Sequence, residues 1–386
     1  MIILSENNLP TAGDTVIEQT QFALFLYILI EEYLKGELIV MIDVIIPAYN
    51  SHGTIIRTLS SIAMQLNRKE LKITIVNDGG KDYKEIVNQF LPFLDIKEIG
   101  YETNRGPGYA RQYGIDNTKE DFITFIDADD TFYEACSLTL LSKPMKDTSA
   151  KFIISPFIQI GKNCEQAPMQ ANLVWVFGHI YRRSFLDEHN IRFTSTRSNE
   201  DVGFNNMCNL IAQNEMGPDG GKVLHAATYE WHYYEASLTR RGKDEYEFGI
   251  CTPGYIYNLH HAYNVAQREG VPLKNIAPAA LETAFSCFIY YNVALAKEVP
   301  TETLEAIEEL SRKFYYDYYK QIQEFISKDD YKNTYTNSYN SKGTHLQGII
   351  FKQTLEQFIE LMFSKPVNEK TYEDIERSVQ TIAEQL

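Results

Sequence analysis

Short apolar runs alternate with segments of helical periodicity between residues 41 and 130. The apolar runs fall at 42–46, 72–76, 96–100 and 122–126. Between the first two, the apolar residues recur at the spacing of one helix face: Ile55, Ile56, Leu59, Ile62 and Ala63. Such alternation predicts a mostly parallel sheet flanked by helices. Ligands of these sheets bind outside the carboxyl ends of the strands, so the residues that follow each strand are the first candidates for chemistry.

The pattern changes further along the chain. Two more strands are predicted at 152–154 and 173–176, followed by a helix near 202–213. After about residue 245, helical patterns dominate, at 251–269, 278–297, 302–327, 346–364 and 370–385. A polar stretch at 329–343 is rich in Asn, Ser, Thr, Tyr and Lys, and this composition predicts an exposed loop.

These patterns predict three parts: an N-terminal helical extension (1–40), an α/β domain (41–245) and a helical C-terminal region (246–386). The first part can be an added helix, an oligomerisation element or an extended reading frame. Its apolar run Phe22–Ile30 is too short to span a membrane, which takes about 20 residues. We interpret it as a buried or partner-facing helix, with a membrane-surface helix as the alternative.

Charge and cysteine content narrow the possible partners. The net charge of −16 argues against nucleic acid held on a broad basic face, and against a polybasic membrane patch. The five cysteines are widely spaced without a C-x-x-C pair, which favours reduced thiols over disulfides or a zinc site. We therefore predict a cytoplasmic protein; peripheral membrane contact and homo-oligomer formation stay open.

An acidic turn follows the predicted strand at 122–126. Asp127, Asp129 and Asp130 supply three carboxylates in four residues. Mg²⁺ and Mn²⁺ prefer such oxygen ligands and share them with phosphate oxygens. The alternative is a solvated acidic turn. An EF-hand calcium loop is excluded, because Thr131 and Phe132 stand where that loop requires an acid or Asn and then Gly.

Three other motifs accompany the acidic turn. Pro47-Ala48-Tyr49-Asn50 breaks the first strand, Asp78-Gly79-Gly80 ends the second, and Asn104–Ile115 leads into a helix. In order and spacing, the four motifs resemble family 2 glycosyltransferases of the GT-A fold, which show P-x-Y-N, D-G-S, N-x-G-x-x-x-A-R-x-x-G-I and D-x-D-D. The departure is Gly80, where Ser is usual. The resemblance covers roughly residues 41–240.

The resemblance implies a GT-A, Rossmann-like α/β fold whose mostly parallel sheet binds a nucleotide sugar. It implies that Asp78 binds the base, that Asp127 lies near the ribose, and that Mn²⁺ or Mg²⁺ binds at Asp129. Asp78 can instead be a turn-forming residue, and Arg111 can form a helix-face salt bridge. The implied donor-binding residues are Pro47, Ala48, Tyr49, Asn50, Asp78, Gly106, Arg111, Asp127, Ala128 and Arg240. The implied metal ligands are Asp127, Asp129 and His232, of which the histidine can also be purely structural.

The acceptor side is implied by later motifs. Trp175–Leu186 resembles the family's W-x-x-x-Y-[KR]-R-x-x-L segment, and Asn199–Phe204 contains its E-D-x-x-F motif. By resemblance, Asp201 is the general base beside Glu200. The pair can also be the acids that favour a helix N-terminus, and both descriptions can hold at once. Near the end of the resemblance, Tyr229–Arg240 resembles a family segment whose arginine clamps the diphosphate.

The interpretation is an inverting, metal-dependent glycosyltransferase that moves a sugar from a UDP-sugar to a hydroxyl, with a cell-surface glycan as acceptor. Three other functions are alternatives to this interpretation. A nucleotidyltransferase would usually show a glycine-rich phosphate loop with a basic residue, and none is present. A sugar-nucleotide-binding protein without catalysis would not need Asp129 and Asp201. A transferase acting on protein or modified nucleic acid stays open, although the acidic charge disfavours nucleic acid.

Overall fold

A computed structural model describes residues 41–234, 247–343 and 346–381. Contacts divide the chain into two compact units, Met1–Val40 and Met41–Leu386, and the second is described below. The predicted N-terminal extension and its run Phe22–Ile30 lie outside the described residues, as does Arg240.

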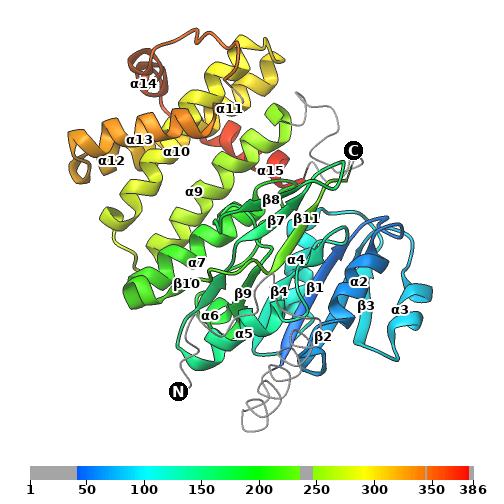
Figure 1. The fold of residues 1–386 in the computed structure, drawn as a ribbon. Helices are drawn as coiled ribbons and strands as arrows, with labels where there is room; N and C mark the ends of the chain where they lie inside the picture. Colours follow the sequence, from blue (N-terminus) through cyan, green and yellow to red (C-terminus); the bar gives the residue numbers. More distant parts are fainter. Residues whose placement is uncertain (1–40, 235–246, 344–345, 382–386) are drawn as a thin grey trace. The chain divides into compact units, whose positions relative to one another are not determined.

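The central sheet has seven strands in the order β10-β6-β9-β4-β1-β2-β3 (Figure 1). They are β1 (Ile42–Ala48), β2 (Leu71–Asp78), β3 (Asp95–Tyr101), β4 (Phe122–Phe125), β6 (Phe152–Ile154), β9 (His179–Arg182) and β10 (Gly221–Val223). All pairs are parallel except the two that β9 forms, with β4 and β6. The α/β fold class and the strands predicted between residues 41 and 154 are confirmed.

The register aligns the strand ends at which the motifs begin. Ala48 pairs with Asn77 across β1 and β2, and Ile45 pairs with Phe125 across β1 and β4. The carboxyl ends of three neighbouring strands therefore lie at one edge of the sheet. This edge is where the sequence places the Tyr49, Asp78 and acidic-turn motifs.

A smaller sheet lies beyond the acidic turn, in the order β5-β11-β7-β8. Its strands are β5 (Thr131–Phe132), β7 (Phe157–Ile160), β8 (Gln166–Met169) and β11 (Tyr229–His232). The strand predicted at 173–176 is wrong: these residues form an irregular segment in which Val174 and Trp175 are exposed. Gly178 then turns the chain with a φ of 67°, and the strand that pairs with β4 begins only at His179.

Helices connect the strands of the α/β part. They are α2 (Ile55–Ala63), α3 (Lys84–Phe90), α4 (Pro107–Asp116), α5 (Ser137–Asp147), α6 (Arg183–Glu188) and α7 (Glu200–Met216). Short 3₁₀ turns lie at Arg68–Glu70 and Gly217–Asp219. Helix α4 packs on β1 and β2, where the missing side chain of Gly114 lets Ile45 and Val76 approach.

The C-terminal part is helical, as predicted. It contains a π-helical turn Glu247–Cys251, α9 (Thr252–Arg268), α10 (Leu273–Ala296), α11 (Thr301–Phe314), a π-helical turn Tyr315–Tyr319, α12 (Lys320–Ile322), a 3₁₀ turn Gln323–Phe325, α13 (Lys328–Ser341), α14 (Leu355–Phe363) and α15 (Glu369–Thr381). Helix α14 is shorter than the predicted 346–364, because its capping box starts at Thr354.

The exposed loop predicted at 329–343 is wrong, because that segment forms α13. The Ser327 hydroxyl accepts a hydrogen bond from the Asp330 N–H and caps the first turn. Tyr331 and Tyr335 then pack edge-on against the Phe285 ring of α10, with centroids 5.0 and 5.3 Å away. Two tyrosines at i and i+4 are enough to anchor a helix whose other positions are polar.

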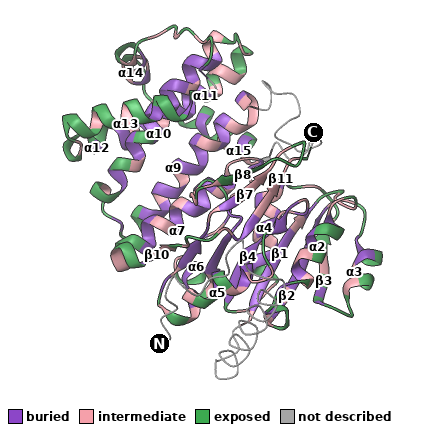
Figure 2. Cartoon of the chain, viewed as in Figure 1, coloured by how far each residue is buried: buried purple, intermediate pink, exposed green. Residues whose placement is uncertain are grey.

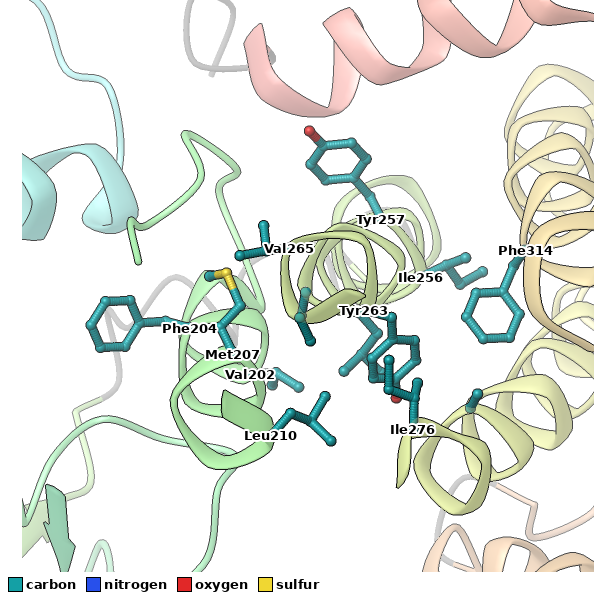
Figure 3. Close-up of a cluster of buried hydrophobic side chains, with 14 of the residues drawn as sticks. Val202, Phe204, Met207, Leu210, Ile256, Tyr257, Tyr263, Val265, Ile276 and Phe314 are labelled. Carbon is teal, nitrogen blue, oxygen red and sulfur yellow. The ribbon is translucent and has the colours of Figure 1, made fainter. Parts of the chain in front are cut away.

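Helix α7 joins the two parts through one continuous core. Its apolar residues Val202, Met207 and Leu210 face α9 and α10 in the cluster drawn in Figure 3, and α11 packs on the other side of α9. Figure 2 shows the buried residues gathered along the central strands and along the facing sides of α9 and α10. Each fully buried aliphatic or aromatic side chain contributes about 1.5–3 kcal/mol. The first turn of α7 is therefore held in place by the helical region.

The longest helix of the described residues, α10, is also apolar enough to cross a membrane by length and composition. Its most apolar window is 72% buried, which is typical of the core helix of a globular protein. Tyr315, Tyr318 and Tyr319 of the second π-helical turn are buried in the same core.

Candidate active site

Asp78 fastens the end of β2 to the start of α4. Its carboxylate accepts hydrogen bonds from the backbone N–H groups of Arg105 (2.6 Å) and Gly106 (2.9 Å). Gly79 and Gly106 have φ values of 75° and 88°, and a Cβ on Gly79 would lie 2.4 Å from the Asn104 nitrogen. Burial raises the pKa of Asp78, and the two N–H groups partly offset this. Since a carboxylate has about four acceptor positions, both oxygens can still accept from a ligand.

The turn after β1 presents an exposed aromatic ring. Tyr49 is 50% exposed, whereas Ala48 is buried and Pro47 is partly buried. Asn50 adopts a left-handed conformation with a φ of 51°. A Cβ on Gly80 would lie 2.9 Å from the Asn50 Oδ1 and 3.2 Å from its backbone nitrogen. The glycine that replaces the usual serine therefore makes room for this turn.

Asp130 anchors the acidic turn and does not cap a helix. One of its oxygens accepts from the Tyr229 hydroxyl and the other from the His232 N–H, each at 2.7 Å. Burial and the neighbouring carboxylates hold the pKa of Asp130 well above its usual range. With its oxygens engaged by β11, Asp130 fixes the position of Asp127 and Asp129, which are only partly buried.

Arg111 joins the acidic turn to the start of α7. Its Nη2 lies 2.8 Å from the Asp127 Oδ1, and its Nη1 lies 2.6 Å from the Glu200 Oε1. Its side chain is only 6% exposed. The arginine therefore forms a salt bridge, but between separate elements and not along one helix face. This ion pair brings the donor-side and acceptor-side motifs to one place.

Asp201 lies in the first turn of α7, as predicted. Burial and the adjacent Glu200 charge raise the pKa of Asp201 to about 8, and Arg111 opposes this rise. Asn199 precedes the helix in a left-handed conformation with a φ of 61°. A Cβ on Gly108 would lie only 2.8 Å from the Glu200 Cγ, so the N-termini of α4 and α7 are in close contact.

His232 sits beside the acidic turn on β11. Its Nε2 lies 2.8 Å from the Thr131 hydroxyl and 3.5 Å from a Glu230 oxygen. The Thr131 hydroxyl donates to Glu230 at 2.6 Å, so it accepts from the His232 ring. Burial and the positive charge of Arg57 lower the pKa of His232.

The donor set at this edge is compatible with a hard divalent cation. No group of three His, Cys, Asp or Glu side chains in the described ranges is arranged as a complete metal site. Mg²⁺ is, however, usually bound by one or two carboxylates together with substrate phosphates, and two partly buried carboxylates, Asp127 and Asp129, are present here. Asp127 shares one oxygen with Arg111. These residues therefore fit a cation whose remaining ligands come from a nucleotide and water.

Two arginines near the site were missed by the sequence analysis. Arg57 on α2 donates to the Asp129 carbonyl, and the positive charge of Arg197 lowers the pKa of Asp78. The Arg197 Cγ would be 3.6 Å from a Cβ on Gly106. Neither arginine belongs to a motif, because each reaches the site only through folding.

Residues 43–199 match the model of glycosyl transferase family 2. An uncharacterized glycosyltransferase of Rickettsia felis is 32% identical over 93 residues, which is 24% of this chain and 15% of that protein. The poly(ribitol-phosphate) beta-N-acetylglucosaminyltransferase TarS of Staphylococcus aureus is 34% identical over 91 residues, which is 23% of this chain and 16% of that protein. The chain thus spans well under two thirds of these relatives.

A solved structure extends the similarity beyond the aligned sequence. The crystal structure of S. aureus TarS 1–349 in complex with UDP-GlcNAc has a TM-score of 0.60 and 18% identity. The superposition covers 81% of this chain and 93% of that one, so the likeness in fold includes part of the helical region. Residues 43–199 are therefore similar to glycosyl transferase family 2, and the chain has the GT-A fold.

Proposed function

We propose that this protein is an inverting, metal-dependent glycosyltransferase that moves a sugar from a UDP-sugar to a hydroxyl of a cell-surface glycan. The observation that carries the proposal is the Arg111 ion pair, which joins Asp127 of the acidic turn to Glu200 beside Asp201. Donor and acceptor chemistry thereby meet at one sheet edge. The UDP-GlcNAc complex of TarS supports a uridine nucleotide.

The donor is held by the turns after β1 and β2. The exposed ring of Tyr49 stacks on the base, and Asp78 accepts a hydrogen bond from it. Asn50, Gly106 and Asp127 surround the ribose and diphosphate. Asp129 and Asp127 hold the cation, with His232 close by. The cation, when bound, neutralises the charge that develops on the nucleoside diphosphate as it leaves.

The acceptor hydroxyl is activated by Asp201. An acid whose pKa is raised to about 8 is basic enough to take a proton from a hydroxyl as that oxygen attacks the anomeric carbon. Glu200 is held by Arg111 and acts as a positioning residue, since its charge contributes to the pKa of Asp201. A single base on the face opposite the leaving group gives one displacement, and therefore inversion. The five free cysteines support a cytoplasmic location.

Donor binding provides the direct test. Thermal unfolding is measured with UDP-, GDP- and dTDP-sugars, with and without Mn²⁺, alongside donor hydrolysis. A donor present at 100 times its Kd adds about 2.7 kcal/mol to the free energy of unfolding. We expect stabilisation by a UDP-sugar that requires Mn²⁺ in the wild type and is lost in Asp129→Asn. Val223→Thr, on an exposed residue of β10, is the control.

The results separate the proposal from its rivals. Equal UDP-sugar affinity in wild type and Asp129→Asn with Mn²⁺ would remove the metal assignment. Metal-dependent binding without hydrolysis or transfer would favour a sugar-nucleotide-binding protein without catalysis.

A further inference from the structure

Three aromatic rings are stacked between the surface and the acidic turn. The Trp175 and Phe177 rings lie 5.4 Å apart at 12°, and the Phe177 and Tyr229 rings lie 4.6 Å apart at 11°. The Tyr229 hydroxyl donates to Asp130 (2.7 Å) and accepts from the Asp127 N–H (3.2 Å). The inner two rings are buried, whereas Trp175 is 37% exposed. Trp175 is thus the surface end of a stack that reaches the candidate donor site.

The same tryptophan is fastened to the helix of the candidate base. The Asn205 side-chain amide donates to the Trp175 carbonyl at 2.8 Å. Asn205 follows Asp201 by four residues, one turn along the same face of α7. The amide is itself held, because its oxygen accepts from the buried Tyr181 hydroxyl at 2.6 Å. The Trp175 backbone is therefore held by a residue that lies one helical turn after Asp201.

The indole is also held rigidly. Phe177 covers one of its faces, and Phe157 packs edge-on at 5.5 Å and 85°. A ring immobilised in this way loses little conformational entropy when a ligand binds, which raises affinity. An isolated exposed apolar residue needs no explanation. A tryptophan fixed by two aromatic rings and by the catalytic helix is a different case, because its exposed side is presented at a defined place.

We propose that Trp175 is the platform on which a pyranose ring of the acceptor stacks. A pyranose presents a face of C–H groups, which packs on the electron-rich face of an indole. The ring places the sugar beside Asp201, and the hydrogen bond from Asn205 keeps that spacing constant. This inference rests on the proposed function, since it assigns the acceptor as a glycan and names its contact.

Fluorescence tests the contact without requiring turnover. The chain has two tryptophans, Trp175 and Trp231, so the emission of Trp175→Phe gives the background from the other. The probes are methyl β-glucopyranoside, methyl β-galactopyranoside and N-acetylglucosamine, with acyclic sorbitol as control. We expect at least one pyranoside to change wild-type emission saturably, with no response in Trp175→Phe or with sorbitol. If no pyranoside acts on wild type, or if the variant responds equally, the platform is overturned.

Kinetics then place the contact on the acceptor side. With a pyranoside that binds, Trp175→Ala should raise the acceptor KM about tenfold, equivalent to about 1.4 kcal/mol. The KM for the donor should change less than twofold, and Trp175→Phe should recover part of the loss. Phe93→Ala, at an exposed residue outside the site, is the control. Equal changes in both KM values would overturn the inference, whereas wild type that turns over no donor would instead overturn the proposed function.

Discussion

Two buried arginines distinguish the sheet edge from the helical region. Arg312 on α11 donates to the carbonyls of Leu361 and Met362 at 2.7 and 2.8 Å, and it pairs with Glu308. It satisfies the C-terminal end of α14, as a helix cap does. Arg111 instead pairs with carboxylates from two separate motifs.

The difference shows what a buried charge is used for in each region. Around Arg312, most partners are neutral carbonyls whose hydrogen bonds hold helices together. Around Arg111, the partners are the acids Asp127 and Glu200. Burial raises the pKa of Glu200 and of the adjacent Asp201, as is typical of functional sites. Burial of an arginine is thus insufficient to indicate function, whereas the identity of its partners is informative.

The largest expected effect concerns Asp201. Asp201→Asn should lower kcat for transfer by roughly 10² to 10⁴, the range expected for loss of a general base. Donor affinity should stay nearly unchanged, because proton transfer is realised only in the transition state. Steady-state kinetics with varied donor check this. Near-normal transfer in the variant would move the role to Glu200 or remove the mechanism.

The arginine pair gives the second prediction. Arg111→Met and Arg312→Met should each destabilise the protein by about 3–5 kcal/mol, because each leaves buried acids without their partner. Urea unfolding measures this loss for both. Activity separates the two variants in conditions where both are folded. The donor KM should be unchanged in Arg312→Met and raised in Arg111→Met. An equal rise of the donor KM in both variants would contradict the distinction between a structural Arg312 and a site-forming Arg111.

The pH dependence of transfer follows from the pKa of Asp201, which is raised to about 8. A base acts when ionised, so kcat/KM should rise about tenfold per pH unit below pH 8 and level off above it. Removing the nearby positive charge in Arg111→Met should move this midpoint upward, because the guanidinium favours the ionised acid. A rate independent of pH between 6 and 8 would exclude Asp201 as the base.

The smallest effect tests the helical region alone. Ser327→Ala removes the N-cap of α13 and should cost about 1 kcal/mol of stability. Ser327→Thr keeps a hydroxyl that accepts from the Asp330 N–H and donates to its carboxylate, and serves as the control. Thermal unfolding measures both, and the KM for donor should be unaffected, since α13 lies in the region without the motifs. A changed donor KM would connect α13 to the site.

Local patterns were sufficient for the predicted strands up to residue 154, for the position of α7 and for the edge at which the motifs gather. They failed where contacts between distant residues decide the structure. Residues 173–176 are apolar enough for a strand, but the ladder with β4 begins only after the turn at Gly178. The composition of segment 329–343 predicts a loop, but Tyr331 and Tyr335 pack against Phe285 on α10 and the segment is helical.

The candidate site shows the same division. The motif residues were found, but their partners were not: Asp130 binds β11 and Arg111 bridges to Glu200, 89 residues away. Arg57 and Arg197 carry no pattern at all. Side chains that meet across such separations leave no periodic signal, so only the folded chain reveals them. The donor and metal assignments of individual residues stay predictions until they are tested.

Gly108 at the start of α4 lies against Thr194 and Glu200, and this contact leaves no room for a larger residue. An added methyl group there would overlap the Thr194 carbonyl, 2.4 Å away, as well as the Glu200 side chain. The N-termini of α4 and α7 are in van der Waals contact at Gly108. Arg111 can reach both Asp127 and Glu200 because the two helices approach this closely. Any substitution at this position widens the gap and separates the two acids that Arg111 holds. The spacing between the start of α4 and the start of α7 thus depends on the absence of a single carbon atom.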